Sequence, residues 1–297
     1  MPIHTPNPMT GRYRSRTKGA NVSITVNFNA SATQAYDTLN ATNSALNTTI
    51  GEMSSGLAIQ TAASNPAGYV SAGLLGDQAA GYGVDITNAQ NGVSMLQTAQ
   101  GALNQAVSIV QQMQQLAYSS ANSGSTDPAA AAANQQEYSA LQSDLTQIAN
   151  TTKFGSQVLL SGTYTGTFQV GTGVSSYSQL AVTISTAATD TGLGLNTTSV
   201  DTQANATTAI TSLSAAINTV DSMQAYLGAQ QNKLQDIVAN LTVGQQNLQS
   251  AQSRIVDTNF AQASTQLATQ QILEQTGASM LATAQQAPNI VLKALGL

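Results

Sequence analysis

A column of apolar residues with a strict spacing of seven runs through the C-terminal part of this 297-residue chain. It consists of Leu213, Val220, Leu227, Leu234, Leu241, Leu248 and Ile255. Because a helix rises about 1.5 Å per residue, the column alone spans roughly 63 Å, which is longer than a compact domain of this size requires. A seven-residue repeat lies along the side of a helix that packs against another helix. The sequence therefore predicts a long helix in a coiled-coil bundle.

A matching stripe in the N-terminal half supplies the partner for this column. Its steps alternate between three and four residues, through Leu96, Ala99, Leu103, Ala106, Val110, Met113 and Ala117. Asn65-Pro66 precedes it and is typical of a helix start, since Asn caps free N–H groups and Pro fits the first turn. SGSTDP at 123–128 ends this helix and begins a third one. We expect an outer seam between Leu96, Leu103 and Val110 and the column from Leu213 to Leu248.

Both ends of the chain carry further amphipathic stripes. Near the N-terminus the apolar positions are Ala32, Tyr36, Leu39, Leu46, Ile50, Met53 and Leu57. Near the C-terminus they are Phe260, Ala263, Leu267, Leu273, Met280, Ala284 and Val291. Apolar stripes at helical spacing require a packing partner. We expect the two terminal helices to pair with each other.

The centre of the chain has a different periodicity. Phe168 and Val170, and then Leu180, Val182 and Ile184, alternate with polar residues among Gly, Ser and Thr, which predicts short strands in a hairpin. The expected fold class is thus mainly α, an elongated helical hairpin or coiled-coil bundle formed by the N- and C-terminal segments, with a small central β-hairpin region.

Composition excludes most kinds of chemistry. Charged residues make up 7% of the chain, where about 25% is usual. His4 is the sole histidine and there is no cysteine, so a His/Cys metal site or a histidine-based catalytic triad cannot be assembled. We expect no enzyme activity, no metal and no cofactor. The low charge fits either an acidic habitat or drift in composition.

Charge and hydropathy also limit the partners. Arg12, Arg14, Arg16 and Lys18 lie in a basic leader, and removing these four from the 8 basic residues leaves 4 against 13 acidic ones. Binding to nucleic acid needs a basic surface, so it is not expected. No run of 18 apolar residues is present, and we expect no membrane-spanning helix.

Two local patterns have competing interpretations. Arg254 and Asp257 stand three apart, a spacing that pairs them on one helix face, either as a surface pair of little energy or as a contact between subunits. GYG at 81–83 is a glycine pair within a helical pattern, and we interpret it as a site of close packing.

Three long stretches resemble bacterial flagellin. They are SALNTTIGEMSSGLAIQTAASNPAGYV at 44–70, IANTTKFGSQVLLSG at 148–162 and SRIVDTNFAQASTQLATQQILEQTGASMLATAQQAPNIVLKAL at 253–295. The resemblance implies export through the flagellar type III apparatus and polymerisation into an extracellular helical filament for swimming. It also implies three kinds of partner: copies of the same chain, hook-associated junction and cap proteins, and an export chaperone at the C-terminus. A hook-filament junction protein is the alternative.

The family's plan implies a division of the chain. Inner-core helices would occupy 23–65 and 257–297, outer-core helices 66–160 and 204–256, and a short β-rich centre 161–203. The self-assembly seams would then be Leu39, Leu46, Ile50, Met53, Leu57, Phe260, Leu267, Leu273, Met280, Ala284 and Val291, with Arg254 and Asp257 as possible polar contacts.

The resemblance also draws attention to two differences. The usual flagellin start aligns with Val22, and valine can be encoded by GTG, which is an alternative start codon. We therefore expect residues 1–21 of the basic leader at 1–22 to be an upstream extension that is absent from the native protein.

Gln112, Gln114 and Gln115 stand where the family typically has Arg, Arg and Glu in the segment that the animal Toll-like receptor contacts. Loss of charge-assisted hydrogen bonds predicts weak activation of that receptor.

Overall fold

The computed structural model describes residues 28–122, 124, 127–173 and 175–294, and side chains as far as Gln286. The basic leader and its proposed start site lie outside these residues. The chain divides into two compact units. The terminal unit contains the residues up to Gln60 and those from Asp257 on, and the central unit is Thr61–Val256.

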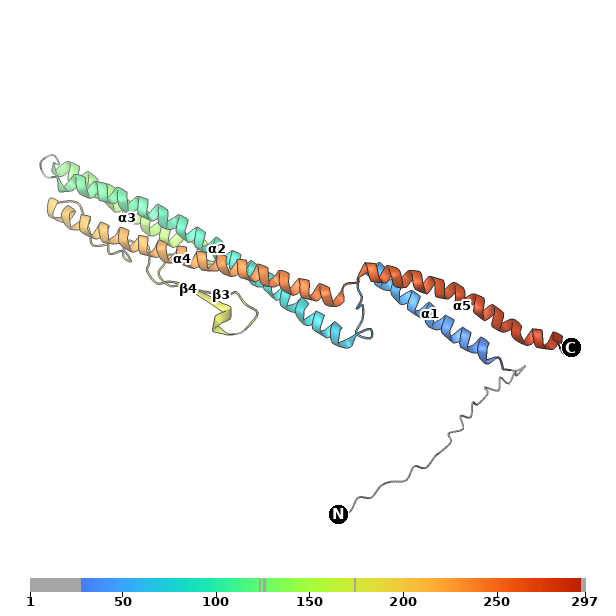
Figure 1. Ribbon diagram of the computed structural model, residues 1–297. Coiled ribbons are helices and arrows are strands. Elements are labelled where there is room, and N and C mark those ends of the chain that lie inside the picture. Colours follow the sequence, from blue (N-terminus) through green and yellow to red (C-terminus); the bar gives the residue numbers. More distant parts are fainter. Residues whose placement is uncertain (1–27, 123, 125–126, 174, 295–297) are drawn as a thin grey trace, which may run out of the picture. The chain divides into compact units, whose positions relative to one another are not determined.

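Three helices build the central unit: α2 (Pro66–Ala121), α3 (Pro128–Thr151) and α4 (Gln203–Val256). α2 begins where the sequence predicts, because the Asn65 side chain accepts a hydrogen bond from the Gly68 N–H at 2.9 Å and Pro66 follows it. Asp127 caps α3 in the same way, through the Ala130 N–H at 2.7 Å. α2 and α4 run side by side, and α3 packs on α2 (Figure 1).

The core of the central unit follows the α2–α4 seam. Its largest fully buried side chains include Met95, Leu96, Leu103, Met113, Leu213, Leu227 and Leu234. Across the seam three glutamine side chains donate hydrogen bonds, Gln114 to Ser214 Oγ at 3.2 Å, Gln224 to Asn104 Oδ1 at 3.0 Å and Gln245 to the Ala79 carbonyl at 3.1 Å. Since each bond pairs one position of α2 with one of α4, they fix the antiparallel register.

A β-hairpin covers part of this seam. Strands β3 (Tyr164–Gln169) and β4 (Gln179–Ile184) pair antiparallel, with Phe168 opposite Leu180. Leu180, Val182 and Ile184 are buried and alternate with exposed residues, so the predicted hairpin is confirmed. Two short strands, β1 (Lys153–Phe154) and β2 (Gln157–Val158), form a second hairpin, and η1 (Ser176–Ser178) precedes β4. The mainly helical fold class with a small β centre is confirmed.

Glycines permit the hairpin to approach α2 closely. A Cβ atom at Gly81 would lie 2.7 Å from Thr172 Cγ2, and one at Gly92 would lie 3.2 Å from the Phe168 ring. The interpretation of GYG at 81–83 as a close-packing site is therefore confirmed for Gly81.

The terminal unit is an antiparallel pair of helices, α1 (Ala30–Ser55) and α5 (Phe260–Ala294). At one end Gly56, with φ 75°, terminates α1, and its carbonyl accepts a hydrogen bond from the Thr258 N–H at 2.8 Å. At the other end Asn29 caps α1 through the Ala32 N–H at 3.0 Å and donates to the Ala284 carbonyl at 2.6 Å. Both capping residues of α1 are thus hydrogen-bonded to the C-terminal segment, Asn29 to α5 itself and Gly56 to Thr258 just before α5.

Candidate self-assembly surface

The helices of the terminal unit meet along a regular seam. Its buried and half-buried positions recur at steps of three and four, as in a coiled coil. On α1 they are Ala32, Ala35, Leu39, Thr42, Leu46, Thr49 and Met53. On α5 they are Ala263, Leu267, Gln270, Glu274, Gly277, Leu281 and Ala284.

Small and polar residues fill much of this seam. Leu39 Cδ1 would lie 3.3 Å from a Cβ at Gly277, so the glycine accommodates the leucine. Thr49 is buried, and its hydroxyl donates to the Ala45 carbonyl of its own helix at 3.1 Å. Gln270 Oε1 is buried without a hydrogen-bond partner among the described residues. The seam thus combines half-buried apolar side chains with small and polar residues.

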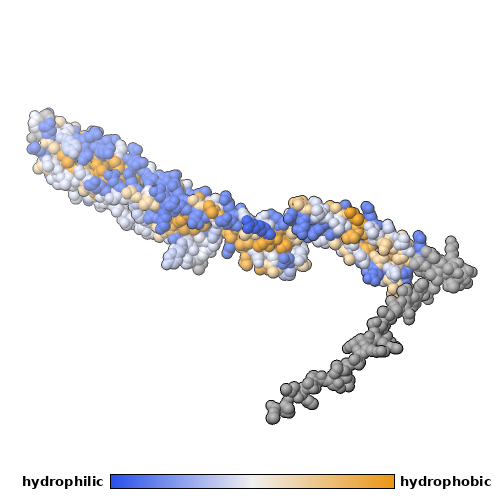
Figure 2. All heavy atoms as spheres, in the orientation of Figure 1, coloured by the Kyte–Doolittle hydropathy of each residue, from blue (hydrophilic) through white to orange (hydrophobic). Residues whose placement is uncertain are grey.

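Several large apolar side chains of the terminal unit lie outside the seam. Ile272 is 64% exposed, Met280 62% and Leu273 51% on α5, and Tyr36 is 55% and Ile50 47% exposed on α1. Phe260 and Leu57 are also exposed. Figure 2 shows hydrophobic residues at the surface of these terminal helices. Exposed apolar surface of this kind marks an interaction site.

The assembly residues expected from the sequence fall on both sides of this division. Leu39, Leu46, Met53, Leu267 and Ala284 lie half-buried in the subunit's own seam. Ile50, Leu57, Phe260, Leu273 and Met280 are exposed. The side chain of Val291 lies outside the described part.

A groove opens beside the seam of the terminal unit. It has a volume of about 450 Å³ and is lined by side chains that include Ala35, Thr38, Leu39, Leu273, Thr276 and Met280. Its lining contains hydroxyl, amide and apolar groups and no charged side chain. The groove can receive an apolar side chain but offers nothing that would bind a charged ligand.

The outer-core seam residues occupy the interior of the central unit. Leu96, Leu103, Val110, Leu213, Val220, Leu227 and Leu234 are fully buried. Leu241 is 9% exposed and Leu248 is half-buried, so burial of the column declines toward the end of α4.

Arg254 lies in the last turn of α4, and Asp257 lies just beyond the end of this helix. α4 ends at Val256, and the backbone of Asp257 forms an isolated antiparallel bridge with Leu57. The two residues therefore do not share one helix, and a contact between their side chains stays a prediction.

The receptor-segment residues lie on α2. Gln112 and Gln115 are exposed, whereas Gln114 is half-buried and bonded to Ser214 of α4. Only two of the three amides are therefore exposed on the surface of the subunit.

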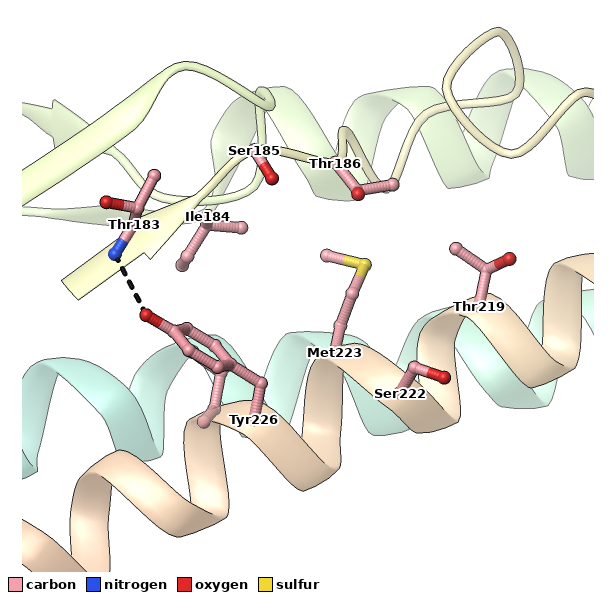
Figure 3. Close-up of a pocket in the computed structure, with 9 residues that line it drawn as sticks. Thr183, Ile184, Ser185, Thr186, Thr219, Ser222, Met223 and Tyr226 are labelled. Carbon is pink, nitrogen blue, oxygen red and sulfur yellow. Dashed lines mark hydrogen bonds between the residues drawn. The ribbon is translucent and has the colours of Figure 1, made fainter.

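A pocket in the central unit had no counterpart in the sequence patterns. It lies between β4 with the residues after it and α4, and has a volume of about 340 Å³ (Figure 3). The hydroxyl of Tyr226 accepts a hydrogen bond from the Thr183 N–H at 3.3 Å. The other lining side chains are hydroxyl, thioether and aliphatic groups, without a carboxylate, amine or imidazole that would serve as acid or base.

Within ranges 28–122, 124, 127–173 and 175–294, no group of three or more His, Cys, Asp or Glu side chains is placed to hold a metal ion. In the same part of the chain, none of the helices has the length and apolar character needed to cross a membrane.

Comparison with known proteins identifies the family. The model of the bacterial flagellin N-terminal helical region matches residues 26–165, and that of the C-terminal helical region matches residues 208–295. Flagellin A of Vibrio anguillarum is 31% identical over an alignment of 382 residues, which covers 92% of this chain and 100% of the relative. A flagellin of Halalkalibacterium halodurans is 35% identical over 82% of this chain and 89% of the relative.

Solved flagellins are also similar. The match to the crystal structure of Bacillus cereus flagellin covers 52% of this chain and 88% of the Bacillus cereus chain, with 25% identity and a TM-score of 0.47. From the two terminal matches and the relatives that align over nearly the whole sequence, the chain belongs to the bacterial flagellin family.

Proposed function

We propose that the exposed apolar faces of α1 and α5 are the surface through which copies of this chain join in the flagellar filament. As a flagellin, the chain is a structural subunit of that filament and not an enzyme. The observation that carries the proposal is the arrangement of side chains in the terminal unit. Thr49, Gln270 and Gly277 lie in the subunit's own seam, while Ile272 and Leu273 are exposed.

The energetics of burial support this assignment. Full burial of a side chain such as Ile, Leu or Met contributes ~1.5–3 kcal/mol. Ile272, Leu273 and Met280 leave at least half of their surface exposed in the single chain, so most of this contribution is available only when another copy covers them. A contact between unlike faces of identical subunits that does not close on itself generates an open helix, which is the geometry of a filament.

The division of the chain into layers is part of the same proposal. The terminal unit would provide the inner core of the filament and the central unit the outer core, with residues 161–203 as a short centre. The finding that supports this division is the separation of the chain into two compact units at Gln60 and Asp257.

We extend the proposal to export and partners on the strength of the family resemblance. The chain would leave the cell through the flagellar type III apparatus and reside in the extracellular filament. Hook-associated junction and cap proteins would contact the two ends of the filament. An export chaperone would bind the C-terminal helix before export, when Ile272, Leu273 and Met280 have no other cover.

Seeded growth of filaments tests the proposal. Purified full-length chain is added to short seeds from sonicated native filaments, and growth is followed by negative-stain electron microscopy. We expect elongation by many subunits. The alternative, a hook-filament junction protein, predicts a chain that caps seeds without extending them, and that result would overturn the proposal.

The receptor segment provides a second, independent proposal. Gln112 and Gln115 are exposed amides that cannot make the charge-assisted bonds of Arg and Glu. We expect weak activation of a reporter cell line that expresses the Toll-like flagellin receptor. A response as strong as that to a flagellin with the usual Arg and Glu residues would contradict this expectation.

A further inference from the structure

Met280 differs from the other methionines whose side chains the structure describes. It is 62% exposed, whereas Met95 and Met113 are buried and Met53 and Met223 are half-buried. The sulfur of Met95 also accepts a hydrogen bond from the Tyr164 hydroxyl at 2.8 Å. Since oxidation of a thioether requires access of the oxidant, Met280 is the described methionine most open to attack.

We propose that Met280 is an oxidation-sensitive site, and that its conversion to the sulfoxide prevents the subunit from joining a filament. The inference rests on the assembly role proposed above for the exposed faces of α1 and α5. The oxidant is hydrogen peroxide. The Met280 sulfur attacks one peroxide oxygen, the O–O bond breaks, and an S=O bond forms. Sulfur loses two electrons, and the second oxygen accepts them and leaves as water after proton transfer.

The surroundings of Met280 explain why the sulfoxide would block assembly. Met280 lines the groove with Leu39 and Leu273, so an incoming apolar side chain would contact its thioether. A sulfoxide is a strong hydrogen-bond acceptor, and burying it without a donor is unfavourable. The groove's threonines already donate within their own helices, Thr38 to Gln34 at 2.9 Å, Thr42 to Thr38 at 2.9 Å and Thr276 to Ile272 at 2.8 Å. The other donors of the lining are the Ser31 hydroxyl and the Gln34 amide, both on α1, whereas Met280 lies on α5.

The subunit itself would tolerate the modification. Met280 lies outside the seam between α1 and α5, whose nearest members on α5 are Gly277 and Leu281. An added oxygen on an exposed side chain displaces no buried group. The effect on assembly is therefore separable from an effect on the fold of the monomer.

The test uses full-length monomers treated with hydrogen peroxide, with sulfoxide located by mass spectrometry and growth measured on filament seeds. We expect Met280 to be modified faster than Met53, Met95, Met113 and Met223, and elongation to slow roughly tenfold or more. Treatment with methionine sulfoxide reductases should restore growth. Preformed filaments should be protected at Met280.

Two variants make the test specific. Met280→Leu keeps an apolar side chain that cannot be oxidised, so it should elongate seeds at the same rate before and after peroxide. Met53→Leu is the matched control in the partner helix and should stay sensitive. Equal growth of untreated and oxidised wild-type monomers, or full sensitivity of Met280→Leu, would overturn this inference alone. Failure of untreated wild-type monomers to extend seeds would instead overturn the proposed function.

Discussion

Asp85 carries an ionisable group at a buried position of α2. It is 4% exposed, and its Oδ2 atom has no hydrogen-bond partner among the described residues. Burial disfavours the charged carboxylate and raises the pKa of Asp85 above the ordinary value of 3.8. Because the folded pKa lies above the unfolded one, the contribution of Asp85 to stability is fully present below about pH 3.8 and is lost as pH rises through the folded pKa.

We therefore expect the stability of wild type relative to Asp85→Asn to decline as the pH rises above about 3.8. The measurement is urea unfolding followed by circular dichroism at several pH values. In the difference between the two free energies of unfolding, the contributions of the other carboxylates to the pH dependence cancel. Asp201 is one of these, since hydrogen bonds from Asn205 and Ser199 lower its pKa and give the opposite pH dependence. A difference that does not change with pH would refute this role of Asp85.

Two glycines of α2 provide opposite predictions. A Cβ at Gly92 would lie 2.9 Å from Leu234 Cδ1 and 3.2 Å from the Phe168 ring, whereas a Cβ at Gly101 would meet nothing within 4 Å. Gly92→Ala should lower the free energy of unfolding by ~1–3 kcal/mol, the usual cost of overpacking. Gly101→Ala should raise it by ~0.5–1 kcal/mol, because glycine is the poorer helix former. Thermal or urea unfolding measures both, and stabilisation by Gly92→Ala would show that the hairpin does not approach α2 this closely.

For single residues, the sequence predicts helix capping more reliably than it predicts which side chains are buried. Asn65-Pro66 identifies the start of α2 because capping depends on neighbouring residues alone. The burial of Asp85 depends on its helical register and on the covering elements, and its sequence neighbourhood contains no sign of it. The position of Asp257 beyond the end of α4 is a similar case, since a three-residue spacing does not reveal that the helix stops at Val256.

Among the elements, α4 carries a leucine column whose positions differ in burial and therefore in their contribution to stability. Leu227 is fully buried against α2, and Leu248 is only half-buried. Leu227→Ala should reduce the free energy of unfolding by ~2–5 kcal/mol, the range for a large core side chain. Leu248→Ala should cost less than half as much. Equal losses at the two positions would mean that the α2–α4 seam is packed uniformly to its end.

The terminal helices show the limit of periodicity as a guide to packing. The N-terminal stripe combines Leu39 and Leu46 with Tyr36 and Ile50, but the structure assigns these pairs to different faces of α1. Thr42 and Thr49 occupy seam positions that an apolar pattern passes over. Where a helix has one apolar face toward its own subunit and another toward solvent, the spacing of apolar residues does not tell the two faces apart. The strict column of α4 was predicted correctly because it has a single buried face.

At the scale of the whole molecule, the two compact units differ in how they are stabilised. The central unit has a continuous core of fully buried apolar side chains such as Leu103, Leu213 and Leu234, although other apolar side chains stay exposed on its surface. In the terminal unit most seam residues are only half-buried, threonine, glutamine and glycine occupy seam positions beside leucine, and Ile272 and Met280 remain exposed. A partner that binds only the folded state stabilises it, and the free energy gained rises with the logarithm of the partner's concentration relative to the dissociation constant. We accordingly expect the terminal unit to gain much of its stability in the filament.

The central claim is that the exposed apolar face of α5 drives subunit addition. The most direct test compares seed elongation by Leu273→Ser and by Gln266→Ser, a substitution of an exposed polar residue on the same helix. We predict that Leu273→Ser slows elongation roughly tenfold or more, since burial of the leucine is lost, while Gln266→Ser elongates like wild type. Urea unfolding of both monomers should match wild type. Unimpaired elongation by Leu273→Ser would contradict the claim.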